Sequence, residues 1–564
     1  MLAFASMPAP PPPLTELRTT AKQSGVQLRI GTETLRSNWR WYGGSREPDQ
    51  LWLPLELLEA QLGFRRTTTP RGDQLEWFGR SAHLASLPTQ ILGDEVGLEV
   101  SDWLRSVGIR SRLEADKLIL SLPAPVIHNL RRGKGVTANR VVLDLSGPAL
   151  VQRRGDDLLI DVQTSAAQRR SLRALGVAPK QHPEGGLLLS GQAARISTLS
   201  LAKPWRIVLD GVQAASAIST PSISLPLHEP AVATLLRKGF VLDRRTLTVG
   251  VKPIEIFRAG GDLKAIGLQM RPLAMTGQQQ GLRFLPQLSQ PSAAVIAVNG
   301  GFFNRITQLP LGALRLNGSW LSGPILNRGA IAWGSSDSLQ FGRLQLHQDL
   351  IVNNRRRWRL DVLNSGYVKR GLSLYTQAWG SQYRALSGEE QAFLIRAGEV
   401  VQRFDQPSLN QGVTISSGTT LVVARGGTAL PARVGDTVKV ATRKTTALAE
   451  QPNVLGGGPL LMNQGQVVLN GRIEGFSPAF LQLSAPRTVV GQGPSGQWLL
   501  TLRGSSGGDP TLLETALACR QLGLHDALNL DGGSSTTLVV AGQTVMNGRG
   551  GSPRVHNGLG LVNR

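Results

Sequence analysis

Short apolar runs, alternating or continuous and separated mostly by glycine turns, dominate the C-terminal three fifths of the chain. From Leu227 onward they predict mainly β-strands, most clearly over residues 246–251 and 293–298. One stretch has clear helix boundaries, with Asp509 or Thr511 near its start, Glu514 in its first turns and a stop at Gly523. The pattern therefore predicts an α+β fold with a β-rich, largely antiparallel domain and few helices.

The first two hundred residues follow another pattern, in which a short helix, a glycine stop and a strand recur. The predicted helices cover residues 53–64, 98–109 and 167–177, and residues 140–144 and 206–210 have the composition of buried strands. This pattern predicts small, repeat-like α+β units. The expected organisation is a proline-rich tether over 1–25, units over 26–125 and 126–213, a linker over 214–226, and one domain over 227–564.

Composition identifies a globular chain with a strong basic excess. Hydrophobic residues make up 41% and charged residues 18%, and 61 Lys and Arg against 38 Asp and Glu give a net charge of +23. Because most of the positive charge comes from arginine, partners that carry phosphate or carboxylate groups are favoured. Nucleic acid is an alternative partner, although the sequence has no zinc-finger spacing and no RNP-like motif. The densest basic run, residues 355–359, either contacts an anionic polymer or is a solvated strand.

Residues 527–547, ALNLDGGSSTTLVVAGQTVMN, hold the strongest candidate for chemistry. A predicted strand delivers Asp531 onto Gly532 and Gly533, and Ser534 and Ser535 follow. A carboxylate beside bare backbone N–H groups and hydroxyls predicts a pocket for a polar, anionic ligand, whereas the alternative is a β-turn with an Asp cap.

Two further stretches have the same layout, a strand that runs into glycines and is backed by a hairpin. One is Asn299-Gly300-Gly301 with a hairpin through Asn317-Gly318, and the other is Gly456-Gly457-Gly458 with a hairpin through Gln464-Gly465. We expect the three glycine corners to converge on one site.

The ordered motifs VNGGFFN, GGGPLL, APRTVVG, ALNLDGGSSTT and PRVHNGLGLV resemble those of the phosphodiester glycosidase family over residues 221–564. The best-known member of that family removes N-acetylglucosamine from a phosphodiester to expose mannose phosphate. The resemblance implies a hydrolase that cleaves glycosyl phosphodiesters. Its leaving group is a phosphate monoester with a second pKa of about 6, so one carboxylate with cationic and amide donors could suffice.

Individual residues have expected roles in such a reaction, and Arg487 falls on the Arg-Thr motif of the family. Asp531 is the expected nucleophile or base, Arg487 the phosphate clamp or a structural ion pair, and Asn299 a ligand-binding amide or a turn residue. Glu474 is the alternative acid, or an exposed turn residue, and His556 is a further candidate acid or base. The residues expected to bind substrate or phosphate are Gly300, Gly301, Gly457, Gly458, Gly532, Gly533, Ser534, Ser535 and Arg554.

The sequence predicts no obligatory metal or other cofactor. No His, Cys and Asp cluster has metal-ligand spacing, although Asp531 with its neighbouring hydroxyls could hold a hard cation. The single cysteine, Cys519, excludes an intrachain disulfide and is expected in the helix core.

The N-terminal units predict adhesion or spacing rather than chemistry. The first resembles the stalk domain of copper amine oxidases, and the RVVLDL and RIVLDG strands resemble modules that place envelope amidases on the cell wall. The starting residues MLAFASMPAPPPP are too short in apolar length for a full secretory signal, and no apolar run of eighteen residues predicts a transmembrane helix.

The resemblance of the N-terminal units to envelope proteins, and a possible signal remnant at the start, predict a location in the periplasm or the cell exterior, with the cytoplasm still open. The expected partner is an anionic sugar phosphate or polysaccharide of the envelope. The alternative function is a non-catalytic binder of anionic cell-wall polysaccharide.

Overall fold

The computed structural model describes residues 23–564 except 32, 44–47, 70–71, 93–94, 134–139, 155–156, 178, 183–184, 190–195, 213–224, 335–337, 444–445, 505–507 and 549–552. Nearly all of the predicted tether and linker lies outside the described residues. The described chain is rich in strands, its sheets are mostly antiparallel and its helices are few and short, which confirms the predicted β-rich character. No described helix has the length and apolarity needed to cross a membrane.

The N-terminal part begins with a seven-stranded sheet of order β7-β8-β3-β2-β1-β10-β9, in which only β1 and β10 pair in parallel. The segment between β3 and β7 forms a three-stranded sheet, β4-β5-β6. The strands are β1 Gln23–Ile30, β2 Glu33–Gly43, β3 Pro48–Pro54, β4 Arg65–Thr69, β5 Gly72–Trp77, β6 Arg80–His83, β7 Thr89–Leu92, β8 Glu95–Glu99, β9 Arg110–Glu114 and β10 Lys117–Ser121.

The next segment forms two four-stranded sheets, β11-β12-β18-β17 and β13-β14-β16-β15. Their strands are β11 Ile127–Arg132, β12 Arg140–Leu145, β13 Val151–Arg154, β14 Asp157–Ile160, β15 Pro179–Gln181, β16 Leu187–Leu189, β17 Ser197–Leu201 and β18 Arg206–Asp210. One hydrophobic cluster, from Leu28 to Val212, runs through both predicted N-terminal units. The two units are therefore packed against each other and do not form separate cores.

The three predicted N-terminal helices are present but shorter than expected. The first is α1, Leu55–Leu57, continued by a π-helical turn over Leu58–Leu62, and the others are α2, Ser101–Ser106, and α3, Ala166–Ala174. Each ends just before the predicted glycine, because Gly63, Gly108 and Gly176 adopt positive φ angles of 81°, 79° and 87°.

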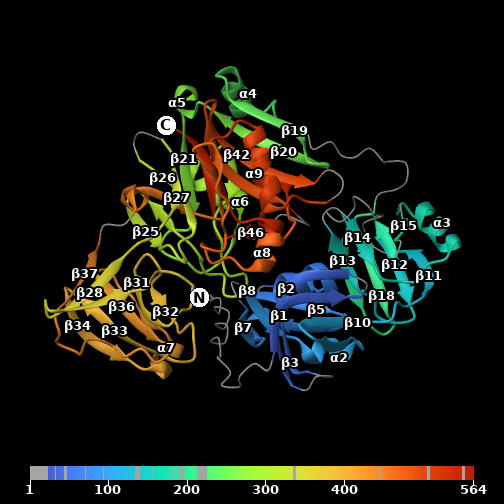
Figure 1. Ribbon diagram of the computed structural model, residues 1–564, viewed down its shortest axis with the longest axis horizontal. Coiled ribbons are helices and arrows are strands. Elements are labelled where there is room, and N and C mark those ends of the chain that lie inside the picture. Colours follow the sequence, from blue (N-terminus) through green and yellow to red (C-terminus); the bar gives the residue numbers. More distant parts are fainter. Residues whose placement is uncertain are drawn as a thin grey trace, which may run out of the picture.

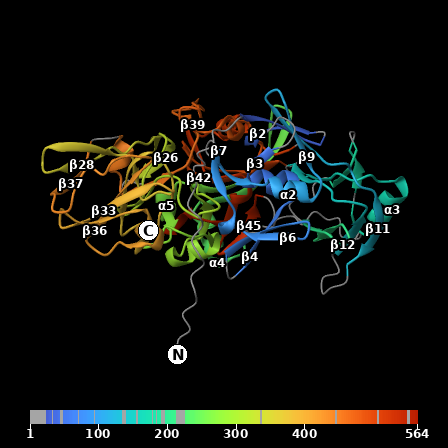
Figure 2. The same ribbon diagram turned by 90° about the horizontal axis from the view of Figure 1, so that it is seen from below.

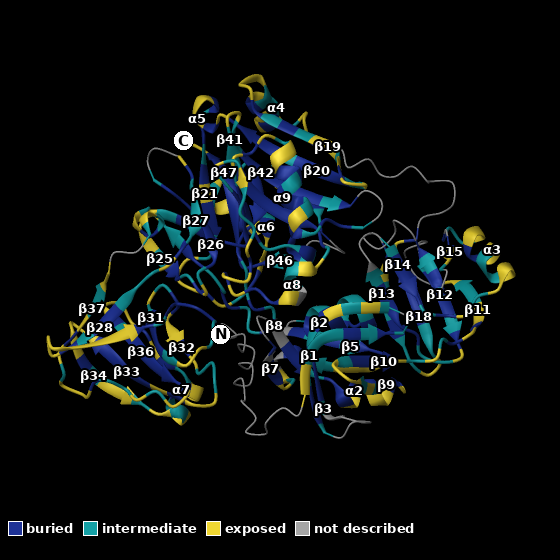
Figure 3. Cartoon of the chain, in the orientation of Figure 1, coloured by how far each residue is buried: buried dark blue, intermediate teal, exposed yellow. Residues whose placement is uncertain are grey.

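The central domain combines a seven-stranded sheet, β19-β20-β42-β41-β43-β39-β40, with two five-stranded sheets, β21-β47-β23-β44-β45 and β25-β24-β38-β26-β27, and the small pair β22-β46. Figure 3 shows its strands as mostly buried. The strands are β19 Val241–Val249, β20 Lys252–Gly261, β21 Leu268–Ala274, β22 Arg283–Phe284, β23 Ile296–Asn299, β24 Leu314–Leu316, β25 Ser319–Ser322, β26 Gly329–Trp333, β27 Gln340–Arg343, β38 Asn453–Gly456, β39 Leu460–Asn463, β40 Gln466–Val467, β41 Arg487–Gly493, β42 Gly496–Gly504, β43 Asp526–Asn529, β44 Thr537–Val540, β45 Gln543–Asn547, β46 Arg554–Val555 and β47 Asn557–Asn563.

The helices of this domain are α4 Pro230–Arg237, α5 Leu263–Ile266, α6 Leu285–Ser289, α8 Pro478–Gln482 and α9 Leu512–Gln521. Helix α9 confirms the predicted helix, since Thr511 caps it through a capping box with Glu514 and Gly523 follows it at a φ of 78°. Cys519 is buried within it. The Glu514 carboxylate also lies 2.8 Å from the Lys252 ammonium, so it has a structural role.

Residues 348–442 form a separate lobe within the predicted single C-terminal domain. In Figures 1 and 2 this lobe and the second N-terminal unit, with strands β11 to β18, lie at opposite ends of the long axis of the molecule. Its sheets are β29-β28-β37, β30-β31-β36-β33-β34 and β32-β35. The elements are β28 Gln348–Val352, β29 Arg356–Leu360, β30 Val362–Leu363, β31 Gly371–Thr376, β32 Gln382–Tyr383, β33 Glu390–Arg396, β34 Glu399–Phe404, α7 Gln406–Gln411, β35 Val413–Thr414, β36 Thr419–Arg425 and β37 Val438–Thr442.

The basic run 355–359 lies on this lobe, where the first four residues of β29 are exposed. It is a solvated strand in the structure.

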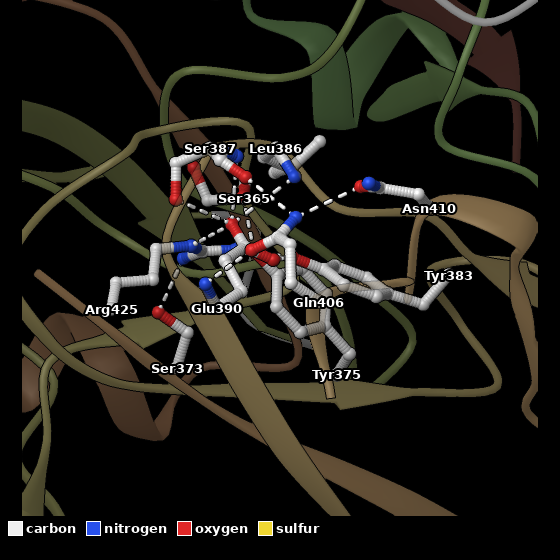
Figure 4. A network of polar contacts seen from close by, with 10 residues as sticks. All are labelled: Ser365, Ser373, Tyr375, Tyr383, Leu386, Ser387, Glu390, Gln406, Asn410 and Arg425. Atoms are coloured by element: carbon white, nitrogen blue, oxygen red, sulfur yellow. Dashed lines mark hydrogen bonds and ion pairs between the residues drawn. The ribbon is translucent and has the colours of Figure 1, made fainter. Parts of the chain in front are cut away.

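A buried ion pair with several polar partners holds the lobe together (Figure 4). The Arg425 guanidinium donates to Glu390 at 2.7 Å, to Ser373 at 2.7 Å and to the hydroxyls of Tyr375 and Tyr383 at 2.7 and 2.6 Å. Arg425 is 1% exposed and Glu390 is 2% exposed. Every donor and acceptor of this kind must be satisfied, since an unpaired charge in such a site is costly.

We expect Arg425→Met to destabilise the lobe by about 3–5 kcal/mol, because the Glu390 carboxylate would lose its buried cation. Hydrogen exchange of the β33 and β36 amides in the full chain measures this locally. The double variant Arg425→Met with Glu390→Gln should recover part of the protection, and Arg356→Met, at an exposed position of β29, should change nothing. Unchanged exchange in Arg425→Met would show that the ion pair does not stabilise the lobe.

Candidate active site

Asp531 lies where the chain crosses from one sheet of the central domain to another. Strand β43 pairs with β41 in the first sheet, and after a short turn β44 pairs with β23 in the second. Gly532 has no room for a side chain, because a Cβ there would lie 2.9 Å from the Pro486 carbonyl oxygen, and Gly533 has a φ of 61°. The two glycines therefore let the chain turn sharply, with the Asp531 side chain facing a cavity.

Asn299, at the end of β23, supports Asp531 from behind. Its amide nitrogen donates to the Asp531 carbonyl oxygen at 2.7 Å, and its amide oxygen accepts from the Thr488 hydroxyl at 2.6 Å and the Thr537 N–H at 3.0 Å. Asn299 is fully buried. It thus joins β23, β41 and β44 at the catalytic candidate, and its amide has little capacity left for a ligand.

Arg305 is the cation whose charge acts on the Asp531 carboxyl group, and the sequence patterns did not identify it. Its guanidinium donates to the hydroxyls of Ser534 at 2.7 Å and Ser535 at 3.4 Å. It lines the same cavities as Asp531. Its position in the sequence could have indicated it, because Arg305 comes directly after the VNGGFFN motif that carries Asn299.

The environment of Asp531 raises the pKa of its carboxyl group to about 6. Removal from water is the largest cause, and the negative charge of Glu56 adds to it. The positive charge of Arg305, the Ser535 hydroxyl and the Gly532 N–H act in the opposite direction. A carboxyl group that titrates near neutrality is suited to general acid–base catalysis.

Three neighbouring cavities share Glu56 and Arg305 in their walls, and we call them together the cleft. The N-terminal part forms one of its walls. The innermost cavity, of about 130 Å³, is bounded by Asp531, Arg305, Arg328 and the aromatic rings of Phe302, Phe476 and Phe480 on the central domain, and by residues 54–56 on the N-terminal side. The Phe476 and Phe480 rings stack 4.7 Å apart, and the Arg328 guanidinium lies 4.2 Å from the Phe476 ring centre. This end of the cleft offers both cations and flat apolar surfaces.

Two adjoining cavities extend the cleft. One, of about 390 Å³, is bounded by Asp531, Gly532, Gly533 and Arg487 and by residues 34–37 of β2. The other, of about 470 Å³, contains a concentration of arginines, namely Arg65, Arg66, Arg153, Arg305 and Arg554. Ser534 and Ser535 also lie on its wall.

Arg487 lies on the wall of the cleft close to Gly532, but its donors face the protein. The side chain is 1% exposed, its Nε donates to the Pro510 carbonyl oxygen at 3.4 Å, and one terminal nitrogen donates to the Leu483 carbonyl oxygen. Its charge still contributes to the positive field of the cleft. A bidentate grip on phosphate by Arg487 would require these contacts to change.

Glu474 lines none of these three cavities, and although it lies in a turn it is buried instead of exposed. Its carboxylate is fully buried and accepts from the Gly329 N–H at 2.8 Å, the Leu460 N–H at 3.1 Å and the Arg343 guanidinium at 3.0 Å. The pKa of Glu474 is raised, because burial has a larger effect than these donors, which lower it. The structure therefore gives Glu474 a packing role, which differs from the alternative acid expected from sequence.

The glycines of the first two corners also serve packing in the structure. The Gly300 and Gly301 N–H groups donate to the backbone and side-chain oxygens of Asn557 at 2.9 and 2.8 Å. Those of Gly457 and Gly458 donate to the carbonyl oxygens of Gly329 and Asn529 at 2.8 and 2.7 Å. None of these four groups is free for phosphate, which corrects their expected role.

The glycine corners nevertheless converge as the sequence suggested. The Asp531 N–H donates to the Gly300 carbonyl oxygen at 2.9 Å, and the Gly458 N–H donates to a carbonyl oxygen of β43. The glycines are needed because a Cβ at Gly301 would lie 2.5 Å from the Gly456 carbonyl oxygen.

Arg554 and His556 differ in their relation to the cleft. Arg554 lies in the arginine-rich cavity and pairs with Asp73 of β5 at 2.8 Å. His556 is buried, contacts the Gln279 carbonyl oxygen at 2.8 Å and accepts from Asn557 at 3.1 Å. Burial lowers the pKa of His556 to about 4, so a neutral, structural imidazole results. Among the described residues no group of three or more His, Cys, Asp or Glu side chains could hold a metal ion.

Residues 389–562 match the sequence profile of the phosphodiester glycosidase family. That region carries a phosphodiester glycosidase domain and includes Asp531, whereas Asn299 and Arg305 precede it. No curated protein matches the chain.

Several solved structures are similar. A hypothetical protein from Synechocystis has 28% sequence identity and a TM-score of 0.57, and the match covers 97% of this chain and 100% of that one. A protein from Burkholderia pseudomallei, provisionally described as an exported protein, has 16% identity and a TM-score of 0.46. The match covers 78% of this chain and 98% of that one. The catalytic domain of zebrafish N-acetylglucosamine-1-phosphodiester alpha-N-acetylglucosaminidase has 14% identity and a TM-score of 0.30, covering 58% and 83%. The Synechocystis structure shows that the arrangement of nearly the whole chain recurs in another protein.

Proposed function

We propose that this protein is a hydrolase that cleaves glycosyl phosphodiesters, that is, esters of a sugar 1-phosphate. The observation that carries the proposal is the placement of Asp531 and Arg305 in one cavity, with Asp531 inside the region that matches the phosphodiester glycosidase family. A carboxylate for the water and a cation for the phosphate are the two groups that this reaction needs most.

The reaction assigned to the cleft is a displacement at the anomeric carbon. Asp531 accepts a proton from water as the water oxygen bonds to that carbon, and the bond from the carbon to the phosphate oxygen breaks with its electron pair on the oxygen. The products are the free sugar and a phosphate monoester. Because the leaving oxygen belongs to a phosphate with a second pKa of about 6, it needs no strong acid, and the charge of Arg305 stabilises it.

The cleft also supports an anionic substrate that is larger than one sugar phosphate. Its arginine-rich cavity lies next to the Asp531 end and shares Arg305 with it. Phe302, Phe476 and Phe480 offer apolar surfaces against which sugar C–H groups can pack. We therefore propose envelope or exported glycans with several phosphates as the substrate class, and a periplasmic or extracellular location.

A panel of synthetic sugar 1-phosphate esters that differ in sugar, anomer and second alcohol tests the proposal. We expect the full chain to release sugar and phosphate monoester from at least one, and to release more from substrates with additional phosphates. Tight binding of an anionic polymer with no turnover of any ester would instead identify a non-catalytic binder of anionic polysaccharide, which the net charge of +23 also favours.

A further inference from the structure

The N-terminal part is docked firmly on the central domain at the cleft. Ile306, which follows Arg305, is buried in the N-terminal hydrophobic cluster. Arg554 of the central domain pairs with Asp73, which is only 9% exposed. Helix α8 also packs on β2, and the two elements lie close together in Figure 1. Three separate contacts therefore fix the position of the N-terminal wall.

This docking brings Glu56 to the catalytic candidate. Glu56 belongs to α1 and lines the innermost cavity together with Asp531 and Arg305. One of its carboxylate oxygens lies 3.2 Å from the position that a Cβ on Gly533 would occupy. In the part of the chain that the structure describes, no hydrogen bond or ion pair engages the Glu56 carboxylate.

An acidic side chain with no partner is unusual beside another acid in a partly closed cleft. Like charges at short range destabilise each other, so packing alone does not explain a second carboxylate here. The nearby cations limit the cost, since Arg305 and Arg328 line the same cavity. An arrangement of two carboxylates and two arginines suits a substrate that has both a negative phosphate and a carbon centre that becomes positive.

We propose that Glu56 is a catalytic residue, so that the active site is complete only with the N-terminal part in place. The inference rests on the proposed function. As the bond between the anomeric carbon and the phosphate oxygen breaks, positive charge grows at that carbon, and the Glu56 carboxylate stabilises it without taking a proton. The N-terminal part then has a role in the chemistry and is more than the spacer expected from its sequence.

The test compares wild type with Glu56→Gln, which keeps the shape of the side chain and removes its charge. We expect kcat to fall about 10²-fold, as for loss of one group that stabilises transition-state charge, with KM changed much less. The acid limb of the pH profile should also move to lower pH, because Glu56 helps to raise the pKa of Asp531. Asp102→Asn, an equal charge change on the exposed side of α2, is the matched control and should behave as wild type.

A second measurement does not depend on turnover. The melting temperatures of Glu56→Gln, Asp531→Asn and the double variant at pH 7.5 form a cycle, and we expect the two increases to be less than additive because both substitutions remove the same repulsion. Additive changes would show that the carboxylates do not meet, and wild-type kcat in Glu56→Gln would show that it is not catalytic; either result overturns the inference. If wild type cleaves no ester while the cycle is non-additive, the proposed function fails although the two acids are neighbours.

Discussion

Asp531→Asn is expected to lower kcat by about 10²- to 10⁴-fold, the usual contribution of a positioned general base. Asparagine keeps the size of the side chain, and its amide oxygen can still accept the hydrogen bond from the Gly532 N–H. It cannot, however, accept the proton of the attacking water. The measurement is release of phosphate monoester from the best ester of the panel. Asp526→Asn is the control, because Asp526 lies at the start of β43, the strand that precedes Asp531, and its carboxylate accepts from Gln464 and Gln492 instead of facing the cleft.

The pH dependence gives the same substitution a second signature. A base with a pKa of about 6 is ionised at pH 7.5 and mostly protonated at pH 5, so the wild-type kcat/KM, which reports groups of the free enzyme, should fall about tenfold between these values. The residual activity of Asp531→Asn should lack this limb. A limb that persists unchanged in the variant would assign the titration to another group.

Stability should change in the opposite direction to activity. The folded protein raises the pKa of Asp531 above its ordinary value of 3.8, so the ionised group destabilises the fold above pH 6 and this penalty shrinks as pH falls from 6 towards 3.8. Asp531→Asn should therefore melt at a higher temperature than wild type at pH 7.5, with a much smaller difference at pH 4. A lower melting temperature at pH 7.5 would indicate that Asp531 serves packing.

Arg305→Lys is expected to lower kcat/KM by about 10²- to 10³-fold, the second largest effect. Lysine keeps the charge but loses the planar fork that can bond two phosphate oxygens and hold both Ser534 and Ser535. Inorganic phosphate should also inhibit the variant more weakly, about tenfold by inhibition constant. Arg357→Lys is the matched control, since that side chain is 63% exposed on the distant lobe.

A loss of activity with unchanged inhibition by phosphate would contradict this role. It would mean that Arg305 only holds the turn after Asp531 in place. The phosphate would then be held by other cations of the cleft, such as Arg328 or Arg554.

Local features of the fold were accessible from the sequence, because each depends on a few neighbouring residues. Asn317 and Gly318 both adopt positive φ angles, 49° and 84°, and connect β24 to β25 as the Asn-Gly signal predicted. The turn at Gln464 and Gly465 connects β39 to β40 in the same way. The capping residues of α9 likewise matched their sequence signals.

The site was only partly accessible, since its completion depends on contacts between distant segments. The glycine corners could be expected to meet at Asp531, but which backbone N–H groups remain free depends on Asn557, more than 250 residues from Gly301. Glu474 lies in a turn, as the sequence suggested, but it is buried there and pairs with Arg343 of β27. Glu56 could not be identified at all, because no local pattern shows that an N-terminal helix docks across from Asp531.

Hydrolysis of the best ester in water enriched with oxygen-18, followed by mass spectrometry of both products, tests the central claim most directly. If Asp531 directs water to the anomeric carbon, the heavy oxygen should appear in the free sugar and none in the phosphate monoester. Heavy oxygen in the phosphate would show cleavage at phosphorus and contradict a glycosidase.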